Sequence, residues 1–591
     1  MRLALEASPV AAVSLVGVVV IESAIGVGLL VAGGRLVGAI ASAVTGHDSG
    51  KVTGAVVLLA VLYAANNVVP AVRSVLAVWL ADRIDQIIRI RLMTKMLAPV
   101  GITHLEDADI RDDVSRAGSL NGFSPGQVIE GLAGILQIRL ASLGAVAIVA
   151  SYRWWLAAVL LFVALATEAA ARRQYMQIAR IVYRQTQDLR RSDYYRSLVM
   201  GAAAKELRVF GLVDWLEGRF AEYWLEAMTE VWRERGQEDR YILWSGPLHV
   251  IANGAAYLLV GDQAARGEIS LARMTVLIGA IGAVRSIISY GLDRTRTEYG
   301  ATAYLPILDL DEKIAGHALR KVDGSREAAG LPVTEIRFDN VSFRYPGRDT
   351  DVFTGLNLTI PAGRSMAIVG TNGAGKTTLC KLLARCYEPT GGRILVDGVD
   401  IQDLDPAAWQ QRIAAVFQDF VTFPLSVRDN IGFGAVANVE DQAALDAAAA
   451  EAAVTGIIEG LANGWDSVLS KVFTAGTELS GGEAQRVALA RALFALRHGA
   501  GVLMLDEPTA SLDVRTEAEL FDRYLELTRG VTSILISHRF STVRHAQRIC
   551  VLSGGTVVEE GSHEDLMALG GPYHAMFSLQ ASRFAEVDAD D

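Results

Sequence analysis

The chain has 591 residues, which is too long for one hydrophobic core and indicates several domains. Its net charge is −11 and it has no basic tail, so composition gives no support to a nucleic-acid partner. The three cysteines, Cys380, Cys386 and Cys550, lack the spacing of metal ligands, and their odd number argues against a disulfide framework.

Apolar runs divide the chain into two halves. The mean hydropathy is +0.30, but the long apolar runs lie before about residue 295, and the remainder alternates like a globular domain. A helix needs roughly 20 apolar residues to cross a bilayer. The first run is too long for a signal peptide and further runs follow it, so we interpret it as a membrane span. The six predicted spans are residues 10–31, 54–80, 132–150, 154–171, 241–260 and 271–290.

Basic residues give the predicted orientation of these spans. Thirteen Arg or Lys residues lie in the loop at about 172–240, whereas the three short loops carry only Arg35, Lys51, Arg153 and Arg266. The two long loops and both chain ends are therefore expected on the cytoplasmic side. The other long loop, at about 81–131, carries Arg83, Arg89, Arg91, Lys95, Arg111 and Arg116.

Both long loops have helical patterns with few Gly or Pro breaks, so each is expected to form two helical arms. At 1.5 Å per residue, such arms are about 30 Å long or more. The turn of the second arm is apolar and basic. This predicts a docking surface, although an ordinary amphipathic turn has the same pattern. The turn consists of Lys205, Glu206, Leu207, Arg208, Val209, Phe210 and Gly211.

Several polar residues lie inside the predicted spans. Ionisable groups are costly in a bilayer, so they usually face a cavity or a partner. These side chains are expected to contact substrate, to pair with one another or to reach the interface. They are Glu22, Asn66, Asn67, Arg73, His249, Asn253 and Arg285.

A phosphate-binding loop lies in the second half, after a predicted linker at about 311–333. It matches the pattern G-x-x-x-x-G-K-S/T. The apolar run 366–369 predicts a buried strand before it, and the run 379–383 predicts a helix after it, which is the setting that the motif needs. Glycines let backbone N–H groups point at one anion. Lys376 is expected to reach the β- and γ-phosphates, and Thr377 to hold Mg²⁺. The loop consists of Gly370, Thr371, Asn372, Gly373, Ala374, Gly375, Lys376, Thr377 and Thr378.

Three weaker signals flank this loop. Tyr345 precedes it and has a ring that could stack on adenine, and Gln418 follows a buried-strand pattern; neither is informative alone. Residues 479–483 open a helical run at 484–497, in which Ser480 and Glu483 fit a capping box. The capping box leaves a glycine-rich helix N-terminus, which is an anion site.

Two predicted strands end in residues suited to phosphate chemistry. The run 502–505 ends at Asp506 and Glu507. Asp506 can hold Mg²⁺ through water, and Glu507 can polarise an attacking water. The run 534–537 ends at His538, which is suited to sensing a γ-phosphate, although a lone histidine is more often structural.

In chain order, these segments resemble the nucleotide-binding domain of ABC transporters, and six spans ahead of them resemble the exporter half-transporters. The resemblance implies a multidomain fold, with an all-α six-helix transmembrane domain at 1–310 and an α/β P-loop ABC ATPase domain at 334–580. Residues 581–591 would form a tail. The resemblance rests on Tyr345, residues 370–378, Gln418, residues 479–483, Asp506, Glu507, residues 511–513 and His538.

The resemblance also implies roles. Two copies, or this chain and a related half-transporter, would hold two ATP molecules, each between the phosphate loop of one chain and the glycine-rich helix start of the other. The turn at 205–211 would dock on the other chain near the partner's Gln418. The implied catalytic residues are Glu507 as general base with His538 and Gln418. The implied Mg²⁺ ligands are Thr377, Gln418 and Asp506. The implied nucleotide contacts are Tyr345, residues 370–378, Ser480, Gly481, Gly482 and Asp513.

The sequence departs from the family in two places. The family signature usually ends in Gln, whereas this chain has Glu483; because Ser480, Gly481 and Gly482 are intact, ATP binding is expected to survive. Residues 473–478 differ from the common multidrug-exporter pattern, which weakens the case for a multidrug substrate. A peptidase domain does not precede the first span, so a leader-cleaving peptide exporter is not expected.

Two functions are compatible with these patterns, and a third is disfavoured by them. The leading one is ATP-driven export of a small amphipathic molecule, peptide or lipid across the plasma membrane, with the nucleotide-binding domain in the cytoplasm. An importer on the exporter fold, for example of a metal chelate, is the alternative, because fold does not fix direction. A soluble ABC-type ATPase acting on nucleic acid or ribosomes is opposed by the spans and the acidic balance. The expected partners are a second half-transporter, membrane lipid and an unknown substrate, with no nucleic acid.

Overall fold

The computed structural model describes residues 2–46, 49–118, 123–184, 186–200, 203–287, 292–316, 326–473, 475–507 and 529–587. The chain forms two compact units. The first contains residues 1–95 and 108–312, and the second contains residues 96–107 and 313–591.

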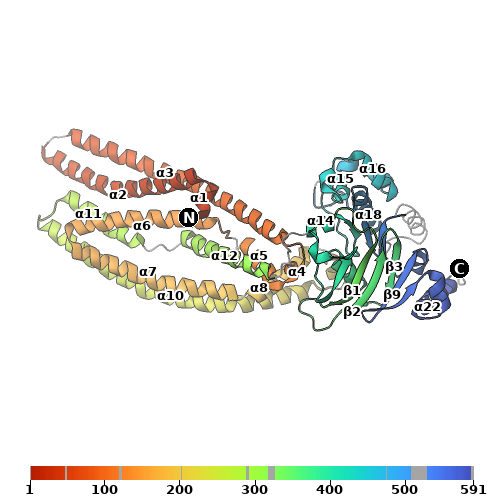
Figure 1. The fold of residues 1–591 in the computed structure, drawn as a ribbon. Helices are drawn as coiled ribbons and strands as arrows, with labels where there is room; N and C mark the ends of the chain where they lie inside the picture. Colours follow the sequence, from red (N-terminus) through yellow and green to blue (C-terminus); the bar gives the residue numbers. More distant parts are fainter. Residues whose placement is uncertain are drawn as a thin grey trace. The chain divides into compact units, whose positions relative to one another are not determined.

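The described residues of the first unit form helices throughout (Figure 1). Long helices suit these apolar sequences, because a helix satisfies its backbone hydrogen bonds internally and needs no water. Ser270 caps one of them by accepting a hydrogen bond from the Arg273 N–H at 3.3 Å. The elements are α1 (Arg2–Ala7), α2 (Pro9–Gly46), α3 (Ser49–Leu97), α5 (Ala108–Gly118), α6 (Gln127–Tyr152), α7 (Trp154–Arg184), α8 (Thr186–Met200), α9 (Ala204–Val209), α10 (Val213–Ala265), α11 (Leu271–Val284), the 3₁₀ turn η1 (Arg285–Ile287) and α12 (Leu292–Ala315).

The long helices run alongside one another (Figure 1). α2 packs against α6 and α11, and α7 packs against α6 and α10. Their shared core includes Leu160 of α7, Val260 of α10 and Ile281 of α11, all fully or nearly fully buried. The described part of the chain has four helices long and apolar enough to cross a membrane, at Pro9–Val44, Gly50–Leu97, Gln127–Tyr152 and Leu271–Ala315, together with a shorter apolar helix at Trp154–Ala169. The span predicted at 241–260 lies within α10. The count of six spans stays a prediction.

The second unit contains two sheets. One is antiparallel with the order β2-β1-β4-β5, and the other has six strands in the order β10-β9-β3-β8-β7-β6. The bounds are β1 (Glu335–Phe343), β2 (Phe353–Pro361), β3 (Ser365–Gly370), β4 (Gly391–Val396), β5 (Val399–Asp400), β6 (Ile413–Val416), β7 (Val502–Asp506), β8 (Thr532–Ile536), β9 (Arg548–Ser553) and β10 (Thr556–Gly561).

The six-stranded sheet brings the predicted strand ends together. β9, β3, β8, β7 and β6 are parallel, so their carboxyl ends share one edge. In register, Ile368 pairs with Ile536, and Ile536 in turn pairs with Asp506. The residues that follow β3, β7 and β8 therefore meet, as expected for a ligand site at the carboxyl edge of a parallel sheet. All five residues of β7 and of β8 are buried, which explains their continuous apolar sequence.

Helices complete the second unit. One core packs Phe338, Phe353 and Trp409 between the sheets and the helix after β3. Another packs Phe494 and Leu493 of the helix after the signature against β6 and β7. The elements are α4 (Thr103–Glu106), α13 (Lys376–Leu383), η2 (Ile401–Asp403), α14 (Pro406–Gln411), α15 (Val427–Gly432), η3 (Val436–Asn438), α16 (Gln442–Glu451), α17 (Thr455–Gly460), η4 (Gly464–Asp466), α18 (Gly481–Arg497), α20 (Phe540–Val543), α21 (His563–Leu569) and α22 (Pro572–Val587).

A short segment from the first half of the sequence folds with the second unit. Residues 96–107, which include α4, cluster with residues 313–591. The Ile102 N–H donates to the Cys386 carbonyl at 3.0 Å, and the Ile102 side chain packs against the core that holds Phe338. The sequence predicts for these residues only that they belong to the cytoplasmic loop at 81–131.

Candidate nucleotide-binding site

The phosphate-binding loop connects β3 to α13, as the sequence predicted. Gly375, with φ +97°, precedes Lys376, the first residue of α13. An ideal Cβ at Gly375 would lie 2.5 Å from Cε1 of the buried Phe353 ring, so no other residue fits without movement. The helix N-terminus thus begins directly at the loop, which places backbone N–H groups and the positive end of the helix dipole together.

Lys376 is buried beneath this loop. Its Nζ donates to the carbonyls of Gly370 at 2.9 Å and Thr371 at 3.1 Å. Burial lowers the pKa of Lys376, and the charges of Glu507 and Asp506 oppose that shift. The ammonium group therefore donates to neutral carbonyl oxygens of the loop. A phosphate oxygen, being charged, would be a stronger hydrogen-bond acceptor for it.

Asp506 ends β7 next to α13. Its Oδ2 accepts a hydrogen bond from the Thr377 hydroxyl at 2.6 Å, and its buried Oδ1 has no hydrogen-bond partner among the described residues. Burial raises the pKa of Asp506, and Glu507 acts in the same direction. A buried carboxylate oxygen without a partner beside a threonine hydroxyl is a suitable pair of donors for a hard cation.

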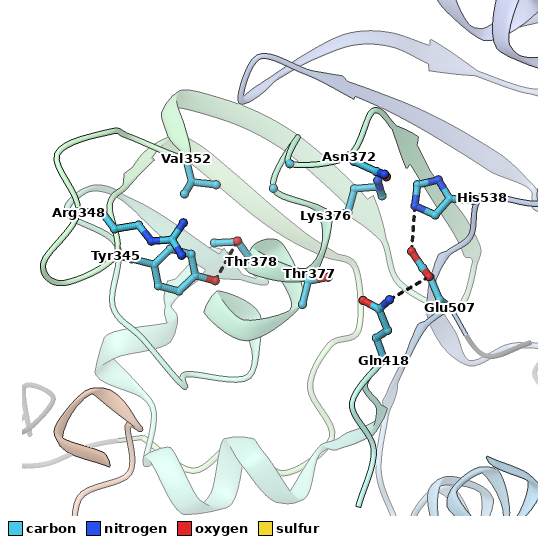
Figure 2. Close-up of a pocket in the computed structure, with 12 residues that line it drawn as sticks. Tyr345, Arg348, Val352, Asn372, Lys376, Thr377, Thr378, Gln418, Glu507 and His538 are labelled. Carbon is cyan, nitrogen blue, oxygen red and sulfur yellow. Dashed lines mark hydrogen bonds and ion pairs between the residues drawn. The ribbon is translucent and has the colours of Figure 1, made fainter. Parts of the chain in front are cut away.

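Glu507 follows Asp506 and lies between two polar side chains (Figure 2). Its Oε1 lies 2.9 Å from Nε2 of His538, and its Oε2 accepts from Nε2 of Gln418 at 3.2 Å. Its φ is +51°, in the left-handed region that non-glycine residues rarely adopt. The Gln485 side chain donates to the Glu507 carbonyl at 3.3 Å. The contacts on both sides hold the carboxylate in place at the strand end.

Lys376, Thr377 and Glu507, with the Gln418 and His538 side chains beside Glu507, line one pocket of about 560 Å³, whereas Asp506 is buried and is not among its lining residues. Tyr345 lies at the other end of the pocket from His538 (Figure 2). Its hydroxyl is 3.0 Å from the Thr378 Oγ1, and its ring meets the Tyr387 ring edge-on with centroids 5.2 Å apart. The pocket is lined by Tyr345, Arg348, Val352, Asn372, Gly373, Gly375, Lys376, Thr377, Thr378, Gln418, Glu507 and His538.

Sequence reasoning missed part of this pocket. Arg348 and Val352 line it, and Arg348 lies 5.7 Å from the centroid of the Tyr345 ring. Tyr387 supports the Tyr345 ring by its edge-on contact. Arg348 is close to Tyr345 in sequence, and a cation there suits an anionic ligand; Val352 and Tyr387 carry no such signal, because their placement depends on the fold.

Some predicted residues do not join this pocket. Ser480, Gly481 and Gly482 lie at the start of α18 and are not among the residues that line it. The predicted capping box of Ser480 and Glu483 is present. Asp513, like Ser511 and Leu512, lies outside the described residues. The roles assigned to all these residues stay predictions.

The polar residues predicted inside the membrane helices are partly paired. Arg73 of α3 donates to Glu22 of α2 at 2.8 Å, so these two form an ion pair between neighbouring spans. The Thr167 hydroxyl of α7 lies 3.0 Å from Nε2 of His249 in α10. The amides of Asn67 and Asn253 donate to carbonyls of their own helices. Pairing, which was one of the three expected outcomes, applies to Glu22 and Arg73.

The comparisons with known proteins agree with this geometry. Residues 353–510 match the family model described as ABC transporter. The fold and the pocket therefore define an ATPase domain of the ABC type that follows a domain of long apolar helices in the chain.

Curated relatives and a solved structure extend the match beyond that domain. The chain is 33% identical over 381 residues, 63% of its length and 61% of the relative's, to an ATP-dependent lipid A-core flippase of Methylobacillus flagellatus. It is 28% identical over 522 residues, 85% of its length and 83% of the relative's, to a protein of the same name from Bordetella avium. It shares its fold, at 22% identity and TM-score 0.76, with a bacterial Atm1-family ABC exporter with ATP bound, covering 97% of this chain and 98% of that one.

These matches show that residues 353–510 form an ABC transporter domain and that the chain as a whole has the fold of an ABC exporter, with a domain of long apolar helices ahead of the ATPase domain. The chain spans 41–61% of the length of four of the flippases that it matches.

Proposed function

We propose that the chain is one half of a dimeric transporter that exports a small amphipathic molecule, peptide or lipid across the plasma membrane at the expense of ATP. One observation carries the proposal: a single pocket joins Lys376 and Thr377 of the phosphate loop to the Glu507–His538 pair. The first unit of the same chain has helices long and apolar enough to cross a membrane. With both long loops inside, the nucleotide-binding domain lies in the cytoplasm.

The pocket fits a Mg²⁺ ion together with ATP. Thr377, Asp506 and Gln418 offer hydroxyl, carboxylate and amide oxygens, which are the donors that Mg²⁺ prefers. The buried, unpaired Oδ1 of Asp506 supports this assignment. When bound, Mg²⁺ would neutralise charge on the phosphates. Tyr345 is positioned to stack on the adenine ring, and Lys376 to exchange its loop carbonyls for phosphate oxygens.

Glu507 is suited to act as the general base. In the proposed hydrolysis, the oxygen of a water attacks the γ-phosphorus, Glu507 accepts the water's proton, and ADP leaves with its bridging oxygen. His538 and Gln418, on either side of the carboxylate, orient it toward the pocket.

A second chain completes the proposed assembly. It would be another copy or a related half-transporter, and each ATP would lie between the phosphate loop of one chain and the start of α18 in the other. The turn at residues 205–211 supports a docking role, since Val209 and Phe210 there are 79% and 70% exposed. Exposed apolar side chains at the end of an arm fit an interface with a partner protein.

Glu507→Gln tests the proposal. It removes the base but keeps the shape, so ATP turnover of the full chain in lipid nanodiscs should fall by orders of magnitude while ATP binding stays near normal. Glu560→Gln is the matched control, because Glu560 pairs with Arg548 at 2.6 Å on the β9–β10 edge and does not line the pocket. Turnover retained in Glu507→Gln would contradict the assignment.

Direction is measured with the same preparations. Turnover-dependent accumulation of a ligand in inside-out vesicles supports export. Accumulation in intact cells would instead support an importer on the exporter fold.

A further inference from the structure

The N-terminus of α18 binds a carboxylate of its own chain, that of Glu483. The Oε2 of Glu483 accepts from both the backbone N–H and the hydroxyl of Ser480, each at 2.8 Å. The Glu483 N–H in turn points to the Ser480 Oγ at 3.4 Å. Both donors of Ser480 are thus engaged with one carboxylate oxygen. A phosphate arriving at this helix N-terminus would need the same donors.

The carboxylate is held in its charged form. The hydrogen bond from the Ser480 backbone, and next the one from its side chain, lower the pKa of Glu483. Glu483 is therefore ionised at neutral pH. Arg486, one helical turn further on, acts in the same direction but more weakly, and its Nη1 points to the Ala453 carbonyl at 3.4 Å. A negative charge consequently remains at a helix start that is otherwise suited to anions.

Capping alone does not require this charge. A glutamine at the third position of the helix can close a capping box with its neutral amide oxygen. The same chain has a second box at α21, where the Ser562 hydroxyl donates to Asp565 at 2.8 Å. That box lies outside the pocket and provides an internal reference for what capping alone contributes.

We propose that Glu483 is a positioning residue that competes with ATP for Ser480. In the nucleotide-free chain it occupies the donors that the γ-phosphate of the ATP bound to the other chain would use, and its charge repels that phosphate. The inference rests on the proposed dimeric function. Closing of the dimer around ATP then requires Glu483 to leave Ser480. It also requires a higher ATP concentration than it would if residue 483 were neutral.

The effect is measured as ATP trapping in full chains in lipid nanodiscs. Glu507→Gln serves as the background because it blocks hydrolysis. Radiolabelled ATP that remains after rapid removal of free nucleotide is measured against ATP concentration, with Mg²⁺ present. Adding Glu483→Gln should lower the half-saturating ATP concentration on the order of tenfold, the scale of repulsion between two like charges a few ångström apart at a hydrated surface. Asp565→Asn in the same background should leave it unchanged.

Salt distinguishes charge from a structural effect. Raising ionic strength from roughly 0.05 to 0.5 M shortens the screening length, so the difference in half-saturation with and without Glu483→Gln should narrow. Glu483→Ala, which also loses the cap, should show the same direction of affinity change with a lower unfolding temperature.

Three results would overturn the inference: equal half-saturation with and without Glu483→Gln, an equal shift from Asp565→Asn, or a difference that ignores salt. Failure of the proposed function gives another signature. If Lys376→Ala leaves ATP binding intact, the phosphate loop does not hold the nucleotide, whatever Glu483 does.

Discussion

Burial shifts the pKa values of Lys376 and Asp506 in opposite directions. It lowers the pKa of the lysine and raises that of the aspartate, so in both cases the folded protein disfavours the charged form. The groups proposed to bind phosphate and Mg²⁺ are thus poorly solvated in the folded protein. A phosphate beside Lys376 and a cation beside Asp506 would each supply an opposite charge. Without these ligands, the two buried charged groups lower the free energy of unfolding.

Asp506→Asn should therefore raise the unfolding temperature of the nucleotide-free protein. The pKa of Asp506 is higher in the folded than in the unfolded chain, so its contribution to stability is present at acidic pH and is lost as pH rises through the folded value. At neutral pH the ionised carboxylate is destabilising, and the neutral amide removes that term. Thermal unfolding in lipid nanodiscs at neutral pH measures this, with the exposed Asp403→Asn as control. A lower midpoint for Asp506→Asn would contradict the burial argument.

Alanine substitutions at two glycines of the phosphate-binding loop distinguish the cost of backbone strain from the cost of a steric clash. Gly373 has φ +80° and an added Cβ would meet nothing within 4 Å, whereas at Gly375, with φ +97°, it would meet the Phe353 ring at 2.5 Å. Gly373→Ala should cost about 1 kcal/mol of backbone strain and weaken ATP binding modestly. Gly375→Ala should abolish measurable binding, because Phe353 is fully buried and has no room to move. Equal losses in a titration with ATP would show that the ring contact is unimportant.

The residues of the pocket could be predicted where a local motif specifies them. The loop 370–378, Asp506, Glu507 and His538 lie in motifs or at strand ends, and the fold brings all of them to one sheet edge. Val352 and Tyr387 could not be predicted, because an apolar side chain and a supporting ring reach the pocket only through the packing of separate elements.

At the scale of elements, the predicted strand–loop–helix, the strands before Asp506 and His538, and the capped helix α18 all appear in the structure. Each has a local signal: a short apolar run, a glycine turn or a capping pair. The segment 96–107 has none. Its placement depends on the contact of Ile102 with Cys386, which lies 284 positions further along the chain. The hydrophobic pattern of a segment predicts which of its faces is buried. It does not predict which distant segment covers that face.

Cross-linking tests this placement. Ile102→Cys should form a disulfide with the native Cys386 under mild oxidation, since the Ile102 N–H and the Cys386 carbonyl lie 3.0 Å apart. Mass spectrometry of the digested protein identifies the linked peptides. Cys386→Ser in the same variant is the control and should abolish the link. Linkage to Cys380 or Cys550 alone would place the segment elsewhere.

At the scale of the whole molecule, the fold class could be predicted because composition changes sharply along the chain. Apolar runs mark the helical domain, and the phosphate loop with its following strand ends marks the α/β domain, in agreement with the shared fold. The substrate could not be predicted. Polar residues such as Glu22 and Arg73 pair with each other, so their presence in a span does not by itself describe a ligand.

Topology is testable with single cysteines. Glu268 lies in the exposed loop between α10 and α11, and Glu217 lies in α10 before the predicted span. In intact cells a membrane-impermeant maleimide should label Glu268→Cys and should label Glu217→Cys only after permeabilisation. The native cysteines are buried or half-buried and lie in the second half of the chain. Labelling of both variants from outside would contradict the predicted orientation.

The segment 96–107 also limits how this chain can be divided. Twelve residues from the first half belong to the fold of the second. A fragment that begins at residue 313 would lack them, leaving the Cys386 carbonyl and the neighbouring apolar surface without the cover that Ile102 provides. Domain exchange between related genes would meet the same constraint. A recombinant that takes one half from each parent must keep Ile102 matched to the surface that it covers. Residue 102 and the surface around residue 386 are therefore expected to be inherited together.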